Sequence, residues 1–184
     1  MHTPSCRRSA RAGGFTLIEL AVTIAVLAII CAMAIPSFTS LIRSNRLSGG
    51  ANEVVAAFQA ARSEAVRLNG AVALCRSEDG ATCTAGDAWT GMVIVDRDGN
   101  LLRTVSLRPG LEVTSDATLS GMNDRITFNA DGLARDSTGA PLATTLSLCL
   151  PVTSPADNIR RVVITGGSRI SITRDNGGGA CTDA

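Results

Sequence analysis

The sequence lacks lysine and tyrosine altogether, and its only histidine is His2, near the N-terminus. Without lysine there is no Schiff-base nucleophile and no P-loop lysine to bind nucleotide phosphates. His2 lies in a segment that we expect to be removed, so the mature chain would have no histidine base and no histidine metal ligand. These absences predict that the protein is not an enzyme and that it binds no metal or cofactor.

Charge is also scarce, and it is unevenly distributed. The formal net charge is +1, which gives no overall attraction to nucleic acid or membrane surfaces. Phe15 to Ile35 is an almost unbroken apolar run whose single formal charge is Glu19. As a helix rising about 1.5 Å per residue, this run would span about 30 Å, the thickness of a bilayer core. A carboxylate there costs roughly 2.5–3.5 kcal/mol on insertion scales, so a partner must neutralise it.

The segment before the apolar run, residues 1–14, is basic. It contains no acid and three arginines, Arg7, Arg8 and Arg11. By the positive-inside rule, this end stays in the cytoplasm and the bulk of the chain lies outside.

A pair of glycines that ends at Gly14 stands before the apolar run rather than after it. A secretory signal is cleaved at small residues behind its apolar region, so this arrangement is different. A lipoprotein signal would use Cys31 as acceptor, but Ile30 before it is too large for that signal. Cleavage after Gly14 would keep the apolar helix and create an amine at Phe15, the nearest partner for Glu19.

The stretch Gly14-Phe15-Thr16-Leu17-Ile18-Glu19-Leu20 resembles the processing site of type IV pilins and type II secretion pseudopilins. The resemblance implies that prepilin peptidase cleaves after Gly14 and methylates the new N-terminus at Phe15. It also implies that Glu19 docks each subunit beside its neighbour in a growing filament. An amine and a carboxylate, each costly alone in lipid, would neutralise one another there.

The helix is expected to continue beyond Pro36, where we predict a kink because proline removes a backbone donor and clashes with the preceding turn. Residues 36–70 would be its amphipathic continuation, with Ser48-Gly49-Gly50 as a point of local unwinding and Asn69-Gly70 as a C-cap. The apolar stripe recurs at spacings near three and four. It comprises Leu41, Ile42, Leu47, Val54, Val55, Phe58, Ala61, Ala65 and Leu68.

Residues 71–184 are predicted to form a β-rich domain, because short β-type runs alternate with turn signals and no helical period follows Leu68. Asp98-Gly99-Asn100 and Gly166-Gly167 are hairpin signals. The expected strands are residues 71–75, 91–96, 101–107, 111–114, 125–129, 144–150, 160–165 and 168–173.

A second resemblance covers this domain and the end of the helix. The segments that carry it are residues 60–69 followed by 72–75, Trp89-x-Gly91-x-Val93, Asp96-x-Asp98-Gly99 and residues 126–132. They are similar to the GspH/FimT-type family. The resemblance implies an α+β, type IV pilin-like fold in which the long N-terminal helix packs on two small antiparallel sheets.

Four cysteines fall within residues 71–184, and they allow three connectivities. Sequence proximity favours two disulfides, Cys75–Cys83 and Cys149–Cys181. Buried reduced thiols are the alternative, and a four-cysteine zinc site is disfavoured because neither pair has close C-x₂₋₄-C spacing. Disulfides would place the domain in an oxidising compartment.

Asp96-x-Asp98-Gly99-Asn100 superficially suggests a calcium loop. An EF-hand loop needs a glutamate at its last position, and Ser106 and Leu107 stand where that ligand would be. We interpret the stretch as a hairpin turn. Asp87 is an acid that tertiary folding could add to such a site.

The last predicted hairpin carries four arginines, which are candidate DNA-binding residues because guanidinium groups bind phosphates. They are Arg160, Arg161, Arg169 and Arg174. Some FimT-type pilins bind DNA through a Gly-Arg-x-Arg motif near the C-terminus. Here Gly167-Ser168-Arg169-Ile170-Ser171 keeps only part of that motif.

Together these features predict a minor type IV pilin, a structural subunit near the pilus tip that primes filament assembly. The alternatives are a type II secretion pseudopilin of H type and a DNA-binding minor pilin for natural transformation. The expected partners are prepilin peptidase, other minor and major pilins or pseudopilins, and the inner membrane before assembly. The β-rich domain would lie in the periplasm until the subunit enters the pilus or pseudopilus.

Overall fold

The computed structural model describes residues 14–86 and 88–181. The leader residues His2, Arg7, Arg8 and Arg11, and also Asp87, lie outside the described residues. The chain forms two compact units, the first ending at Thr39 and the second beginning at Ser40. Helix α1 (Leu17–Leu68) contributes to both.

The first unit contains the apolar part of α1. Within residues 14–86 and 88–181, α1 is the helix that is long and apolar enough to cross a membrane. Its large side chains are exposed, as at Leu17, which is 86% exposed, and Leu27, which is 60% exposed. The helix continues through Pro36, and the kink there stays a prediction.

The helix is also continuous through Gly49 and Gly50, so the prediction of local unwinding is wrong. Gly50 is buried, and a Cβ atom there would lie 2.5 Å from Leu111 Cδ1 and 3.2 Å from Leu148 Cδ2. A Cβ atom at Gly49 would lie 3.2 Å from the guanidinium carbon of Arg108. Glycine lowers helix propensity, but here it lets the helix approach the β-rich part closely, and the packing outweighs the propensity.

The buried stripe of α1 begins later than the sequence suggested. Its fully or almost fully buried members are Leu47, Ala51, Val54, Ala57, Phe58, Ala61 and Ala65. Leu41 and Ile42 are each 56% exposed and Leu68 is 42% exposed, so these three members of the predicted apolar stripe are not buried. These three residues lie at the two ends of the stripe. There the apolar spacing continues along the helix, but no other part of the second unit that the structure describes covers the side chains.

The predicted C-cap at Asn69-Gly70 is confirmed. Asn69 has a positive φ of 48°, and its N–H donates to the Val66 carbonyl at 3.2 Å. The Gly70 N–H donates to the Ala65 carbonyl at 3.1 Å. This pair of bonds is a Schellman motif, which satisfies two of the last carbonyls of the helix and turns the chain into the first strand.

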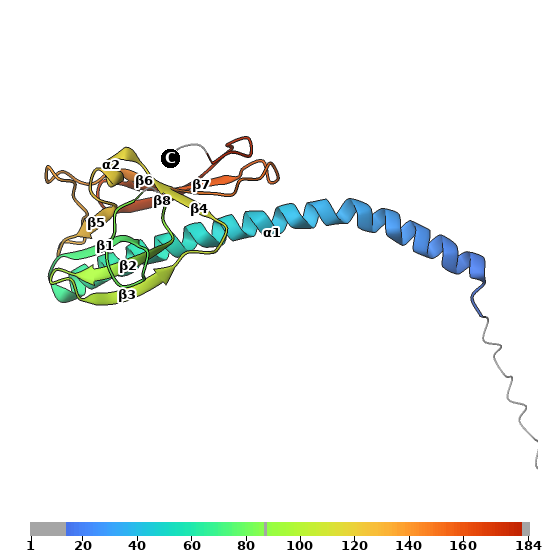
Figure 1. Cartoon of the computed structure of the whole chain (residues 1–184), viewed down its shortest axis with the longest axis horizontal. Coiled ribbons are helices and arrows are strands. Elements are labelled where there is room, and N and C mark those ends of the chain that lie inside the picture. Colours follow the sequence, from blue (N-terminus) through green and yellow to red (C-terminus); the bar gives the residue numbers. More distant parts are fainter. Residues whose placement is uncertain (1–13, 87, 182–184) are drawn as a thin grey trace, which may run out of the picture. The chain divides into compact units, whose positions relative to one another are not determined.

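Within the described residues, eight strands form two antiparallel sheets beside the C-terminal half of α1 (Figure 1). The first has the order β3-β2-β1-β5 and the second β4-β6-β7-β8. The strands are β1 (Val72–Ser77), β2 (Gly91–Asp96), β3 (Leu101–Ser106), β4 (Glu112–Ser115), β5 (Arg125–Phe128), β6 (Thr144–Cys149), β7 (Ile159–Thr165) and β8 (Arg169–Asp175). All eight predicted strands and the two-sheet arrangement are confirmed.

Both predicted hairpins are present. Gly99 has a φ of +87° between β2 and β3, and Gly166 and Gly167 have φ values of +59° and +73° between β7 and β8. One short helix, α2 (Ala117–Ser120), was not predicted. Its signal is local, because the side chain of Asp116 caps it by accepting a hydrogen bond from the Leu119 N–H at 2.9 Å.

One hydrophobic core lies between α1 and the two sheets. It joins helix residues such as Phe58 to β-sheet residues such as Ile94, Phe128 and Leu146, all with no exposed surface. The two predicted disulfides are present as well, Cys75–Cys83 and Cys149–Cys181. The second unit therefore has an interior core and two covalent staples of its own.

Candidate functional site

The single carboxylate of the apolar helix, Glu19, lies at the start of the helix and is bonded to Thr16. Glu19 Oε2 accepts hydrogen bonds from the backbone N–H and the hydroxyl of Thr16, both at 2.9 Å. In return, the Glu19 N–H donates to Thr16 Oγ1 at 3.3 Å. This reciprocal arrangement is a capping box, which satisfies donors that the first turn of a helix leaves without partners.

The capping box gives Glu19 a role within its own chain that we did not predict. A Thr-x-x-Glu spacing before an apolar run is the signal that could have revealed it. All of these bonds use Oε2 or the Glu19 N–H, so Oε1 has no hydrogen-bond partner among residues 14–86 and 88–181. Phe15 precedes the helix and is almost fully exposed. The carboxylate therefore accepts two internal hydrogen bonds at Oε2 and can accept another at Oε1 from outside the chain.

The surface around this carboxylate is apolar. Ile18, Leu20, Val22 and Ile24 are all more than half exposed. Cys31, the free cysteine of the described residues, is exposed on the same helix. A helix that presents apolar side chains in this way must be covered by lipid or by other apolar helices.

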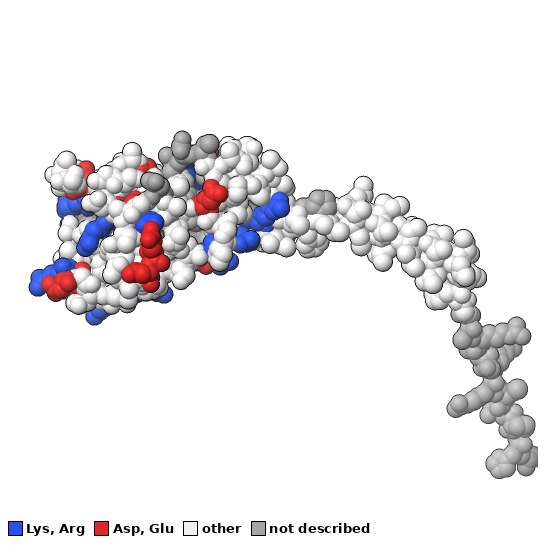
Figure 2. Space-filling view, viewed as in Figure 1, with Lys and Arg blue, Asp and Glu red and all other residues white. Residues whose placement is uncertain are grey.

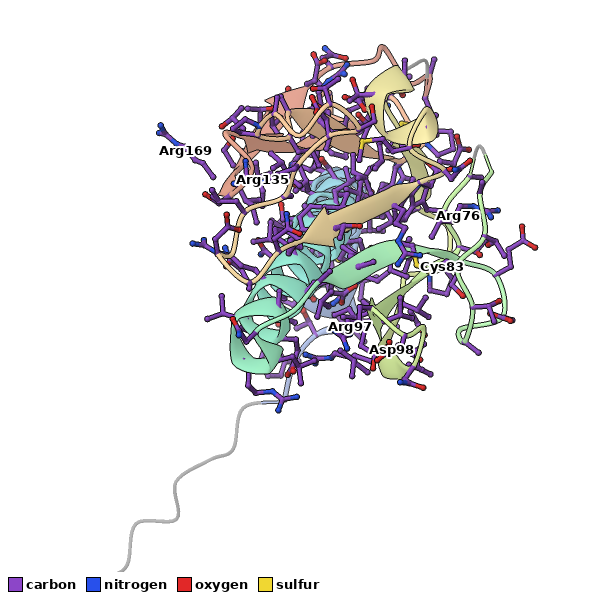
Figure 3. The ribbon with its side chains drawn as sticks, turned by 90° about the vertical axis from the view of Figure 1, so that its left-hand side faces the viewer. Arg76, Cys83, Arg97, Asp98, Arg135 and Arg169 are labelled. Atoms are coloured by element: carbon purple, nitrogen blue, oxygen red, sulfur yellow. A yellow bond between two sulfur atoms is a disulfide. The ribbon has the colours of Figure 1, made fainter. Side chains whose placement is uncertain are left out.

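The four C-terminal arginines do not form one surface. Arg160 and Arg161 are neighbours on β7, so their side chains leave opposite faces of the sheet. Arg160 is 1% exposed, and Arg161 forms an ion pair with Asp175 at 2.9 Å. Arg169 and Arg174 are exposed on β8, and Arg169 extends away from the body of the second unit (Figure 3).

Arg160 is held by oxygen acceptors that carry no charge. Its Nη1 donates to the backbone carbonyls of Asp157 at 2.9 Å and Ile159 at 3.0 Å, and its Nη2 donates to Ser44 Oγ at 3.3 Å. Burial lowers the pKa of Arg160 from its usual value, and the neighbouring charge of Arg174 lowers it further, while Asp157 acts in the opposite direction.

A second buried arginine, Arg76 on β1, was not predicted from the sequence. It donates to the Ala88 and Ala85 carbonyls, and its Nη2 forms an ion pair with Glu78 at 2.7 Å. Arg76 and Cys83 lie on the same side of the β-rich part (Figure 3). Arg76 thus ties to β1 both Glu78, inside the loop that the Cys75–Cys83 disulfide closes, and the segment that follows that loop. This is a structural role, and no local pattern marks it.

Asp96 is used by the turn between β2 and β3. Its Oδ1 accepts from the N–H groups of Asp98 and Asn100 at 2.9 and 2.8 Å, and its Oδ2 accepts from Asn100 Nδ2 at 2.8 Å. These bonds, led by the Asn100 side chain, lower the pKa of Asp96. No group of three potential metal-ligating side chains occurs within the part of the chain that the structure describes. The hairpin interpretation of this stretch is confirmed.

Charged side chains of both signs are interspersed on the face of the second unit that Figure 2 shows, which agrees with the low net charge. Such a surface gives no strong long-range attraction to a polyanion. The two features that stand apart from it are the carboxylate of the apolar helix and the buried guanidinium of Arg160.

Comparison with known proteins gives two family matches. The family described as type II transport protein GspH matches residues 50–168, more than half of the chain. The prokaryotic N-terminal methylation motif matches residues 9–35. No curated protein matches the chain in sequence.

Solved structures of pilin-like proteins are similar to the chain. Two crystal structures of the type IV minor pilin FimU from Pseudomonas aeruginosa share 25% and 26% sequence identity with it, with TM-scores of 0.50 and 0.53. The similar regions cover 69% and 71% of this chain and 92% and 90% of those chains. The minor pseudopilin EpsH from the type 2 secretion system of Vibrio cholerae shares 12% identity with a TM-score of 0.47, over 70% of this chain and 97% of that chain.

Proposed function

The chain belongs to the GspH family and has a type IV pilin-like fold, and we propose that it is a minor pilin, a structural subunit that primes assembly near the tip of a type IV pilus. The observation that carries this proposal is the position of Glu19. It is the one carboxylate of the exposed apolar part of α1, and it lies one turn from the proposed new N-terminus at Phe15.

Processing would prepare this site for assembly. Prepilin peptidase would cut between Gly14 and Phe15 and methylate the Phe15 amine, which the match to the N-terminal methylation motif supports. The apolar helix would hold the subunit in the inner membrane with the second unit in the periplasm. The two disulfides support that compartment, because they persist where the environment is oxidising.

Assembly would then use the free oxygen of Glu19. In a subunit alone in the bilayer, the Thr16 donors reduce the cost of the carboxylate without neutralising its charge. The methylated Phe15 amine of a neighbouring subunit would supply the opposite charge. Because each charge is costly alone in lipid, pairing them favours stacked helices over separate ones.

The choice of a pilus rests on the likeness to FimU, whose two structures are described as a type IV minor pilin. The family description, type II transport protein, favours the second candidate, a pseudopilin of type II secretion. DNA capture has less support, because burial and the ion pair with Asp175 leave Arg169 and Arg174 as the exposed members of the four arginines.

Deleting the gene and complementing it with variants tests the proposal. We expect the deletion strain to lose surface pili and twitching and to keep type II secretion. The wild-type gene should restore the pili and the twitching. Lost secretion with normal piliation would overturn the pilus role in favour of the pseudopilin.

Mass spectrometry of the assembled subunit should find a methylated Phe15, and Gly14→Ala should leave the precursor uncut.

Two variants separate the charge of Glu19 from its capping bonds. Glu19→Gln keeps a capping-box side chain and removes the charge, whereas Thr16→Ala removes the cap and keeps the charge. We expect Glu19→Gln to abolish incorporation into filaments and Thr16→Ala to reduce it less. Normal incorporation of Glu19→Gln would show that the charge pair does not drive assembly.

A further inference from the structure

A cavity of about 250 Å³ lies between α1 and the last two strands. It is lined by Ser48 and Asn52 from the helix and by Arg160, Ile172 and Arg174 from β7 and β8. Binding sites for small molecules usually measure about 300–1,000 Å³, so this cavity suits a small ion or one terminal group of a larger molecule. All of its lining residues belong to the second unit.

The cavity contains a buried positive charge without a counter-ion. Arg160 is 1% exposed, and no carboxylate among residues 14–86 and 88–181 forms an ion pair with it. Its Nε is buried and has no hydrogen-bond acceptor in that part of the chain. A buried charge that lacks a partner is unfavourable, so an anion at this point would stabilise the fold.

A second positive charge stands directly opposite the first. Arg174 is the register partner of Arg160 across the β7–β8 pair, and like charges in that position repel one another. Arg174 forms no ion pair within the described residues and is exposed at the cavity. The other charged group near Arg160 is Asp157, whose backbone carbonyl rather than its carboxylate bonds the guanidinium.

The helix adds neutral donors to this pair. Ser44, Ser48 and Asn52 recur every four residues, so they share one face of α1. Ser44 already accepts from Arg160, whereas the side chains of Ser48 and Asn52 have no hydrogen-bond partner within residues 14–86 and 88–181. A hydroxyl and an amide are therefore free to donate toward the cavity.

We propose that this cavity is a binding site for a phosphate group, with Arg160 and Arg174 supplying the charge and Ser48 and Asn52 supplying further donors. A phosphate carries close to two negative charges, so it would neutralise both arginines, whereas one carboxylate would neutralise only one of them. Free phosphate and the headgroup of a phosphatidic acid both present this group. The site does not depend on whether the protein forms pili.

The test measures phosphate binding to the full mature chain in a phosphate-free detergent. We expect inorganic phosphate to raise the melting temperature saturably above the effect of chloride at equal ionic strength. Arg174→Gln should weaken phosphate binding roughly tenfold or more, because it removes a charge-assisted contact. Arg169→Gln is the matched control, since Arg169 is an exposed arginine of the same strand outside the cavity.

A second variant tests the site without removing either arginine. Asn52→Asp would place a tethered carboxylate at the cavity, so it should raise stability without phosphate and diminish the phosphate effect. In nanodiscs, a melting temperature that responds to phosphatidic acid and not to free phosphate would identify the lipid as the source, and the reverse would identify the free ion. No response to either, or equal losses in Arg174→Gln and Arg169→Gln, would overturn the proposal.

Discussion

The two parts of α1 are both rich in apolar residues, but the first part leaves them exposed and the second part buries them. In the first unit, side chains such as Leu27 and Ile29 are exposed by more than half of their surface. In the second unit, Leu47 and Phe58 have no exposed surface, because the two sheets cover them. The first part therefore needs a bilayer or neighbouring subunits to cover it, whereas the second part is stabilised by its own chain.

The largest expected effect tests this difference directly. Phe58→Ala removes a fully buried ring and should lower the free energy of unfolding of the second unit by about 3–5 kcal/mol. Leu27→Ala removes an exposed side chain and should leave that free energy nearly unchanged. Urea unfolding of the full chain in detergent measures both, with fluorescence of Trp89, the only tryptophan, reporting on the core in which it lies.

Equal losses from Phe58→Ala and Leu27→Ala would show that the two parts of the helix unfold as one. In that case the exposed part would contribute to the stability of the second unit, and the separation into two units would not describe its energetics. The incorporation of Leu27→Ala into filaments is the complementary measurement. If neighbouring subunits cover the Leu27 side chain, its removal should weaken incorporation rather than the stability of the second unit.

The disulfides provide the next largest effect, and both lie in the second unit. Replacing both cysteines of Cys149–Cys181, which are 32 residues apart, with serine should cost about 3.7 kcal/mol by loop entropy. The same change at Cys75–Cys83, 8 residues apart, should cost about 2.5 kcal/mol. Cys31→Ser in the apolar helix is the control and should have no effect on this unfolding. A larger loss at the shorter loop would contradict the entropic ranking.

Two adjacent glycines, Gly49 and Gly50, lie where α1 packs against the β-rich part, and they are expected to respond differently to substitution. Gly50→Ala would push a Cβ atom against Leu111 and Leu148, and this overpacking should outweigh the gain in helix propensity, for a net loss of about 1 kcal/mol. Gly49→Ala meets only the flexible end of Arg108, so it should be neutral or stabilise by up to about 1 kcal/mol. Thermal unfolding of both variants under one condition checks the sign, and a stabilising Gly50→Ala would refute the close approach.

Local patterns predicted the elements well because turn and strand signals in this chain are dense. Gly99 and the Gly166-Gly167 pair mark hairpins by the positive φ that they adopt, and Asn69 marks the helix end in the same way. The glycines at 49 and 50 misled the prediction, since their low helix propensity is local and the contact with Leu111 that favours them is not.

The arginines show why the site was only partly predictable. Alternation along a strand requires Arg160 and Arg161 to face opposite sides, so grouping all four by nearness in sequence could not describe one surface. Which of the two is buried depends on the side of the sheet that α1 covers, through Ser44, and this is a contact across 116 residues. Glu19, in contrast, was identified correctly as the one charge of the apolar run because its context is entirely local.

The smallest expected effect concerns acidic pH and again belongs to the second unit. Backbone and side-chain donors lower the pKa values of Asp96, Asp131, Asp136 and Asp175 in the folded chain. A carboxyl whose folded pKa lies below its unfolded value of about 3.9 contributes stability above that value, and the contribution is lost as pH falls through the folded pKa. The urea midpoint reported by Trp89 should therefore stay level from pH 7 to about 5 and decline below about 4.

Asp96→Asn should reduce that decline slightly, whereas Asp98→Asn, whose carboxylate accepts none of these turn bonds, should not. A midpoint that rises on acidification would reverse the sign that these hydrogen bonds require.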